Sequence, residues 1–229
     1  MMTGFSDDSP SQYQRIHELL RAHYPFQQDE FDFQITAVHE QASVESRNPV
    51  HYEKWKQYLQ RVKAQAKGVL RVSPASATVM LPALEGTFTL RREKMGRVVY
   101  KRKFRVFLSL IGSFYTMFGQ DEVLIEAAEA LGTNNEVVSF APVLYPMPLD
   151  IYEKWFFLIR ETMIDVYPGY EFVPYSILRH RLKDIATGFL GAEGMPQSLF
   201  QALFSAEDIN AYCTQEDRNR RPFEYGEFE

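Results

Sequence analysis

The chain has 229 residues, of which 45% are hydrophobic and 24% charged, and its formal net charge at pH 7 is −5. This composition is sufficient for a hydrophobic core, and it excludes a collagen-like repeat and a wholly disordered chain. The single cysteine, Cys213, excludes an intramolecular disulfide. Together with an N-terminus that lacks a signal-peptide pattern, it predicts a reducing, cytoplasmic location. The longest uncharged stretch, residues 106–120, is too short for a membrane-spanning helix, so no membrane association is expected.

The N-terminal third predicts two helices with a strand between them. A Ser-Pro start and apolar residues at helical spacing predict a helix over residues 10–23. Residues 31–38 alternate between apolar and polar side chains, as a half-buried strand does. A second helix is expected to begin at Asn48 and Pro49 and to end near Gly68, a position suited to a left-handed cap.

The middle of the chain predicts β-structure. Short runs predict strands at residues 69–73 and 78–81. Residues 86–91 and 97–108 flank Gly96, which can supply the positive φ of a tight turn, and they predict an antiparallel hairpin. The apolar pattern continues as far as Phe118, so the second arm is expected to run on as a strand or bent strand buried on both faces.

The remaining elements are mainly helical. Apolar residues at helical spacing predict a helix over residues 123–131 that ends at Gly132, and a short strand at 137–141 follows. Further helices are expected at residues 150–166, 176–187, 197–204 and 205–212. We therefore predict an α+β protein whose mainly antiparallel sheet, about residues 69–118, is packed by the N-terminal helices and the C-terminal helical half. Residues 1–213 are expected to form one domain, and 214–229 a charged, aromatic tail.

The sequence contains no motif of the common enzyme classes. It has no Walker loop, dinucleotide-binding glycine pattern, nucleophile elbow or HExxH pair. The glycines at 188, 191 and 194 follow a predicted helix, whereas a phosphate-binding loop follows a strand, so they predict a connector. The five histidines form no i, i+4 pair. No catalytic residue, metal or cofactor is therefore predicted.

The hairpin is the strongest charge feature. Residues 91–105 contain eight basic residues and one acid, whereas the rest of the chain has 17 basic and 29 acidic residues. In the second arm the even positions are apolar, apart from Arg102, so one face of the sheet is expected to be core and the other basic. The basic odd positions are Arg97, Lys101, Lys103 and Arg105.

This basic face has three interpretations. In the first, the cations are solvated and protect the edge of the sheet against strand addition. In the second they recognise an acidic protein, and in the third they contact the phosphates of a nucleic acid. Nucleic acid is disfavoured because the basic positions have no interleaved rings for base stacking and the rest of the chain is acidic. The aromatic segment 167–175, with Tyr167 and Tyr170, is either a recognition loop or a set of rings packed over the helices.

These features predict a non-catalytic cytosolic protein that occludes a protein partner, as immunity or antitoxin-type proteins do. The expected partner-binding residues are Arg97, Lys101, Lys103, Arg105, Tyr167 and Tyr170. One alternative is a hydrolase or nucleotide-modifying enzyme whose acid and base meet only in the fold, from among Glu153, Glu161 and His180. The other is a nucleic-acid-associated accessory protein that uses the basic hairpin. No oligomeric state follows from the sequence.

Overall fold

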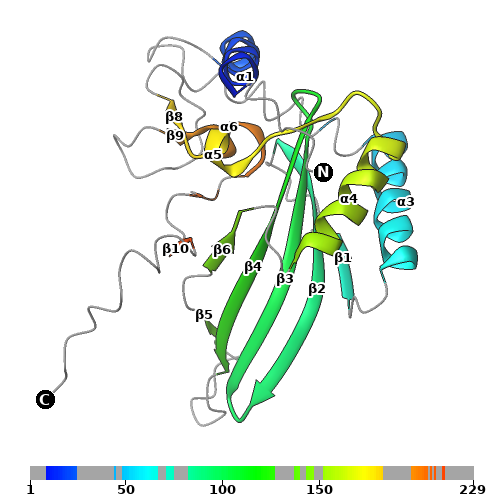
Figure 1. Ribbon diagram of the computed structural model, residues 1–229, viewed down its shortest axis with the longest axis vertical. Coiled ribbons are helices and arrows are strands. Elements are labelled where there is room, and N and C mark those ends of the chain that lie inside the picture. The colour runs from blue at the N-terminus through cyan, green and yellow to red at the C-terminus, as the bar shows by residue number, and fades with distance from the viewer. Residues whose placement is uncertain are drawn as a thin grey trace, which may run out of the picture.

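A mainly antiparallel sheet built on three long strands forms the centre of the molecule, which confirms the predicted α+β class (Figure 1). The long strands are β2 (Ala83–Met95), β3 (Val98–Ser109) and β4 (Phe114–Glu126). The computed structural model describes residues 9–24, 44, 48–66, 71–74, 82–126, 137–139, 143–146, 152–182, 197–205, 207, 209 and 213–214. The division of the chain into a domain and a tail stays a prediction, because residues 215–229 lie outside this described part.

Short strands extend the sheet on both sides of the three long ones. The strand order is β1-β2-β3-β4-β6-β10, and β5 and β7 also pair with β4. The short strands are β1 (Arg71–Pro74), β5 (Val137–Ser139), β6 (Val143–Tyr145), β7 (Glu171–Phe172) and β10 (Cys213–Thr214). A separate two-stranded sheet consists of β8 (Arg181–Leu182) and β9 (Gln197–Ser198).

The β2–β3 hairpin follows the prediction closely. Gly96 has a φ of 60°, the left-handed conformation that the turn requires and that glycine adopts without steric cost. The two strands pair along their whole length, with one shift of register between Thr89 and Arg91. This bulge means that β2 residues on either side of it change their alternation between the two faces.

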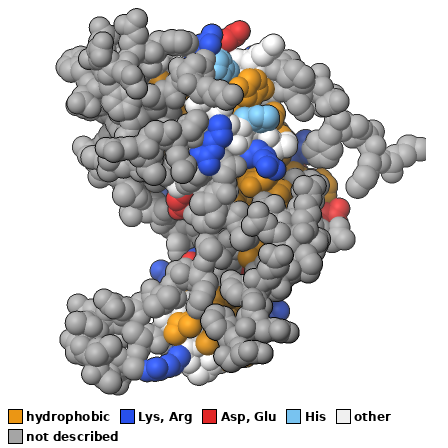
Figure 2. Space-filling view, turned by 90° about the vertical axis from the view of Figure 1, so that its left-hand side faces the viewer, with side chains coloured by type: hydrophobic (Ala, Val, Ile, Leu, Met, Phe, Trp, Pro, Cys, Tyr) orange, Lys and Arg blue, Asp and Glu red, His pale blue; other side chains and the backbone are white. Residues whose placement is uncertain are grey.

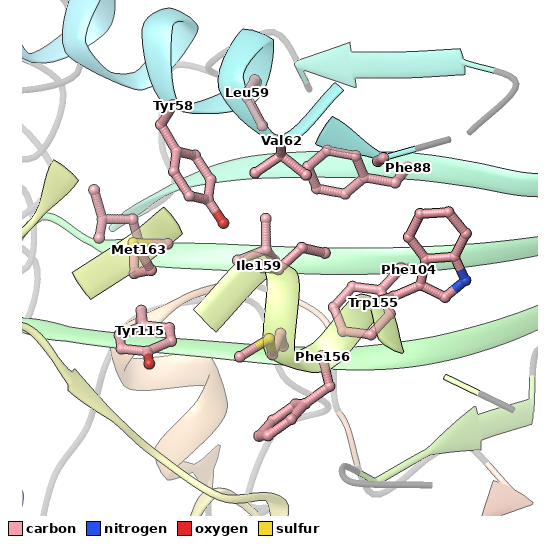
Figure 3. Close-up of a cluster of buried hydrophobic side chains, with 14 of the residues drawn as sticks. Tyr58, Leu59, Val62, Phe88, Phe104, Tyr115, Trp155, Phe156, Ile159 and Met163 are labelled. Atoms are coloured by element: carbon pink, nitrogen blue, oxygen red, sulfur yellow. The ribbon is translucent and has the colours of Figure 1, made fainter. Parts of the chain in front are cut away.

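Helices cover both faces of the sheet. One hydrophobic cluster joins α3 (Pro49–Gln65) and α4 (Glu153–Val166) to the even-numbered residues of β3 (Figure 3). A second cluster joins α1 (Ser9–His23), α5 (Tyr175–Leu178) and α6 (Leu199–Leu203) to Phe107 on the opposite face. Among the described residues, no helix is both long and apolar enough to cross a membrane.

The start of α3 shows how local sequence determines an element. The Asn48 side chain accepts a hydrogen bond from the Val50 amide at 3.1 Å, and Pro49 occupies the first helical position. Trp55, Tyr58, Leu59 and Val62 then recur at helical spacing and are buried against the sheet. The predicted helix is confirmed, but it ends at Gln65 with Ala66 as its C-cap, two residues before the predicted cap at Gly68. The predicted strands at 31–38 and 78–81 lie outside the described residues.

Two predictions for the sheet were wrong. The second hairpin arm does not run on to Phe118, because the chain turns at residues 110–113 and returns as β4. The predicted helix at 123–131 is also contradicted, since Val123, Leu124 and Ile125 belong to β4. They pair with β3 on one side, and Leu124 and Ile125 pair with β5 on the other, so cross-strand pairing outweighs an apolar spacing that also fits a helix.

The C-terminal half is less helical than predicted. The helix at 150–166 is confirmed as α4, whereas the helix expected at 176–187 ends at Leu178. The chain instead enters β8, and the Leu199 amide donates a hydrogen bond to the His180 carbonyl at 3.0 Å. The helix expected at 197–204 is divided into β9 and α6, which Ser198 caps. The glycines at 188, 191 and 194 lie outside the described residues.

The expectation that one face of the hairpin is core and the other basic is also wrong in part. At β3 residues 104–108 both faces are buried, because α1, α5 and α6 cover the face that carries Phe107. No buried member of either cluster comes from residues 98–103 of β3. The parts of the long strands that lie toward the hairpin turn, residues 91–103 and 120–126, form the lower end of the sheet in Figure 1. They are named here the arm.

Candidate functional site

Cross-strand register places four cations on one face of the sheet, three of them in the arm and one, Arg71, on the neighbouring strand β1. Arg71 lies opposite Thr89, and Thr89 lies opposite Lys103. In the next row, Arg92 lies opposite Lys101. Directly opposed residues share a face of the sheet, as do residues two apart on one strand, so all four cations project to one side. Arg71, Arg92, Lys101 and Lys103 are named here the basic face.

These two rows contain one acid. Glu122 of β4 lies opposite Lys101, whereas the row of Lys103 ends at the neutral Gln120. The Glu122 Oε2 atom is 2.6 Å from the Lys103 Nζ and 3.8 Å from the Lys101 Nζ. Within the described part of the chain, neither arginine of the basic face forms an ion pair. The rows therefore carry an excess of positive charge.

Burial and the excess of positive charge together lower the pKa of Lys101. Partial burial lowers the pKa of its ammonium group, and the other three cations of the basic face lower it further. Glu122 acts in the opposite direction, but its attraction does not restore the ordinary pKa. An additional anion at this position would reduce the repulsion among the cations, which makes the basic face suited to binding negative charge.

Arg105 projects to the same face but is only 6% exposed. Its Nε donates to Glu85 at 2.7 Å, and its Nη1 and Nη2 donate to the two carboxylate oxygens of Glu207 at 2.8 and 3.1 Å. Its guanidinium also lies 4.9 Å from the centre of the Phe107 ring. Arg105 thus joins β3 to β2 and to the C-terminal segment. Its contact with a partner stays a prediction.

The other predicted binding residues lie apart from the basic face. Arg97 is exposed in the hairpin turn. Tyr167 is 3% exposed and packs against Trp55 and Tyr58 of α3, with ring centres 6.4 and 6.2 Å apart. The Tyr170 ring lies 5.4 Å from Tyr167. The interpretation that these rings pack over helices is therefore confirmed for Tyr167, and the structure does not bring the tyrosines together with the cations.

A second charged group on the arm lies on the opposite face and is neutralised. Arg102 donates two hydrogen bonds to Asp121, at 2.9 and 3.0 Å, and the hydroxyls of Tyr145 and Tyr152 donate to the same carboxylate. Burial disfavours the charged form of Asp121, but hydrogen bonds from Arg102, Tyr100 and Tyr145 outweigh it and lower the pKa. This pairing explains why Arg102 interrupts the apolar positions of β3.

The residues considered for an enzyme are separated by the sheet. The His180 ring lies 5.4 Å from Tyr13 of α1, on the side of α1, α5 and α6. Glu153 and Glu161 belong to α4, which packs on the other face. In the described ranges, no group of three or more His, Cys, Asp and Glu residues is arranged to hold a metal ion. The structure thus does not bring the three proposed acid–base residues together.

Sequence reasoning missed half of the basic face. Arg71 falls in a predicted short strand without a role, and Glu122 precedes the predicted helix at 123–131 and has no predicted role. Arg92 belongs to the first hairpin arm, whose bulge changes which residues face which side. The sequence signal that could have identified these residues is charge complementarity, because the acids of residues 120–122 match the cations of 101–103 in antiparallel order.

Comparison with known proteins identifies no relative of the chain. No protein-family model matches it, and no curated protein or solved structure does. Its function is therefore inferred from the charges and geometry of its own residues. Described Lys and Arg side chains are visible on both the upper and the lower part of the molecule (Figure 2), but the register identifies the cations that share one face.

Proposed function

We propose that the chain is a non-catalytic cytoplasmic protein that binds an acidic protein partner and blocks it stoichiometrically, as immunity and antitoxin-type proteins do. The basic face is the proposed contact. The observation that carries the proposal is the presence of four cations and one acid in two adjacent rows of the sheet, with both arginines unpaired among the described residues. Dense positive charge speeds encounter with an acidic surface, and arginine then binds carboxylates in a bidentate manner.

An acidic protein fits this face better than a nucleic acid does. The other residues of the two rows are Thr89, Gln120 and Glu122, so the two rows offer no ring on which a base could stack. The chain as a whole is negatively charged, which opposes the approach of a polyanion such as DNA over a large area. A protein with a confined acidic patch needs to contact only the basic face.

The test uses the full chain as bait in a nuclease-treated lysate of its own source. The recovered partner is identified by mass spectrometry and its affinity is then measured at several salt concentrations. Lys101→Glu combined with Lys103→Glu removes the lysine pair of the basic face. Arg61→Glu combined with Lys63→Glu makes the same charge change on the exposed side of α3 and serves as the matched control.

The proposal is supported if one partner is recovered at a fixed ratio after nuclease treatment and binds more weakly as salt is added. Its binding should be lost with the Lys101→Glu, Lys103→Glu variant and kept with the α3 variant. Equal loss with the α3 variant would show that net charge, and not the basic face, determines binding. Recovery that depends on nucleic acid, or the absence of any stoichiometric partner, would contradict the proposal.

A further inference from the structure

We propose that Glu122 is an internal substitute for a carboxylate of the partner. In the free protein it occupies the lysine pair of the basic face, and an acidic segment of the partner displaces it on binding. This inference rests on the proposed function and adds a means of regulating the same surface. Glu122 sets the affinity of the basic face by competing for it.

The position of Glu122 shows where the basic face holds a carboxylate. A single oxygen, Oε2, lies within 4 Å of both ammonium groups, at 2.6 Å from Lys103 and 3.8 Å from Lys101. The two lysines project to the same face because they are two residues apart on β3. Their ammonium groups therefore form a preformed position for one carboxylate group, supplied here by the neighbouring strand.

The adjacent residue on β4 shows why Glu122 can be exchanged. Both oxygens of Asp121 accept directed hydrogen bonds, two from the planar guanidinium of Arg102 and one each from two tyrosines. Among the described residues Glu122 has only lysine partners, and its Oε2 atom is buried without a directed hydrogen bond. Lysine acts as a point charge and lacks the fixed geometry of a bidentate arginine pair. Asp121 is thus held by directed hydrogen bonds, whereas the contacts that Glu122 makes with described residues of the basic face are ion pairs.

The charge of the surrounding face favours a second carboxylate. Glu122 offsets one of four positive charges, and its attraction leaves the pKa of Lys101 below the ordinary value. Arg71 and Arg92 lie on the side of the lysines away from β4 and form no ion pair with a described residue. An incoming acidic segment can therefore engage the arginines first and then replace Glu122 at the lysines.

The spacing of the cations fits an extended acidic segment. Residues two apart on a strand are about 6.8 Å apart, and the same repeat separates alternate side chains of any extended peptide. A segment with an acid at every second residue can place one carboxylate in the position of Glu122, between Lys101 and Lys103, and the next beside an arginine of the basic face. We therefore choose a peptide of alternating glutamate and serine as the probe, with a DNA oligonucleotide of equal charge for comparison.

The first experiment measures the affinity of the fluorescently labelled peptide for the full chain and two variants. Glu122→Gln keeps the size of the side chain and frees both lysines, so we expect the peptide to bind about 3- to 5-fold more tightly. Glu93→Gln is the matched control: it makes the same charge change on the arm, but Glu93 lies opposite Tyr100, on the other face, and pairs with Arg91. For this variant we expect a change of less than about 2-fold.

The second experiment needs no substitution. A carbodiimide joins a carboxylate to an amine in contact with it, so the free protein is expected to form a Glu122–Lys103 cross-link, detected by mass spectrometry. Saturating peptide should suppress that cross-link. A peptide of alternating lysine and serine should leave it unchanged, because it brings no carboxylate.

The outcomes separate the two proposals. If the wild-type chain binds the oligonucleotide but not the acidic peptide, the proposed function fails and the role of Glu122 fails with it. If the wild-type chain binds the peptide but Glu122→Gln gains no more than Glu93→Gln, only the role of Glu122 is refuted. Persistence of the cross-link at saturating peptide would refute that role as well.

Discussion

The same three strands have two different environments along their length. At β3 residues 104–108, helices cover both faces and the side chains are almost all apolar. In the arm each face instead carries a cross-strand ion pair, Lys103 with Glu122 on one and Arg102 with Asp121 on the other, beside a smaller number of apolar side chains such as the buried Val99.

This difference suggests that one part of the sheet stabilises the fold and the other part binds a partner. The covered part obtains its stability from buried area and packing, which leaves no charge available for a partner. The arm is held by backbone pairing to its neighbours, so its side chains contribute less to stability and are free to carry an excess of charge. Substitutions in the two parts should therefore affect different properties, stability in the first and binding in the second.

The largest loss of stability is expected from Phe107→Ala. Phe107 is fully buried and its ring packs against Phe118, Phe200 and Phe204. Truncation of a buried phenylalanine costs about 3–5 kcal/mol of unfolding free energy, measured by urea denaturation. Phe104→Ala, on the opposite face of the same strand, is the matched control and should cost a similar amount. A much smaller cost at Phe107 would mean that α1, α5 and α6 do not form a full second layer.

Arg105→Met tests the boundary between the two parts. Removing the guanidinium leaves Glu85 without its ion-pair partner in a half-buried position, and it removes the ion pair of Arg105 with Glu207. We expect a loss of about 2–4 kcal/mol, because an uncompensated carboxylate is costly away from water. Adding Glu85→Gln to the same chain should recover part of that loss. If Arg105→Met alone has no effect on the urea midpoint, the buried pairing does not stabilise the fold.

Asp121→Asn tests the neutralised face of the arm. The variant loses charge-assisted hydrogen bonds from Arg102, so we expect a cost of about 1–2 kcal/mol at neutral pH. The pKa of Asp121 is lowered in the folded state, so its contribution is complete above the unfolded pKa of about 3.9 and is lost as the pH falls through the folded pKa. Urea unfolding of both chains between neutral and strongly acidic pH should show their stabilities converge. Parallel curves would contradict this.

Much of the fold could be predicted from local signals. The Asn48–Pro49 start of α3 and the glycine turn of the hairpin depend on residues adjacent in the chain, and both are confirmed. The strand at Val123–Ile125 was missed because its conformation depends on partners in β3 and β5, which a helical spacing of apolar residues does not reveal. Local chemistry was predictable, whereas long-range pairing was not.

The candidate site was predicted in outline only. The alternation of β3 identified Lys101 and Lys103, but it could not show that α6 and Glu207 would bury Arg105. The bulge after Thr89 changes the face to which Arg92 projects, and no turn residue or proline marks it in the sequence. The tyrosines were grouped with the cations by composition, which contains no information on which side of the sheet a segment packs.

The smallest effect on stability is expected from Arg92→Gln, and it gives the sharpest contrast with the covered part. Arg92 is exposed and repels Lys101, so its removal should change the unfolding free energy by less than about 0.5 kcal/mol. The pKa of Lys101, followed by NMR, should rise toward its ordinary value because one repelling charge is gone. Arg97→Gln makes the same charge change in the hairpin turn, outside the rows of the basic face, and should leave that pKa unchanged. Equal shifts of the Lys101 pKa in the two variants would mean that Lys101 responds to the overall charge of the arm. A pKa shift with Arg92→Gln alone, at unchanged unfolding free energy, would mean that the cations of the basic face influence one another without contributing to the stability of the sheet.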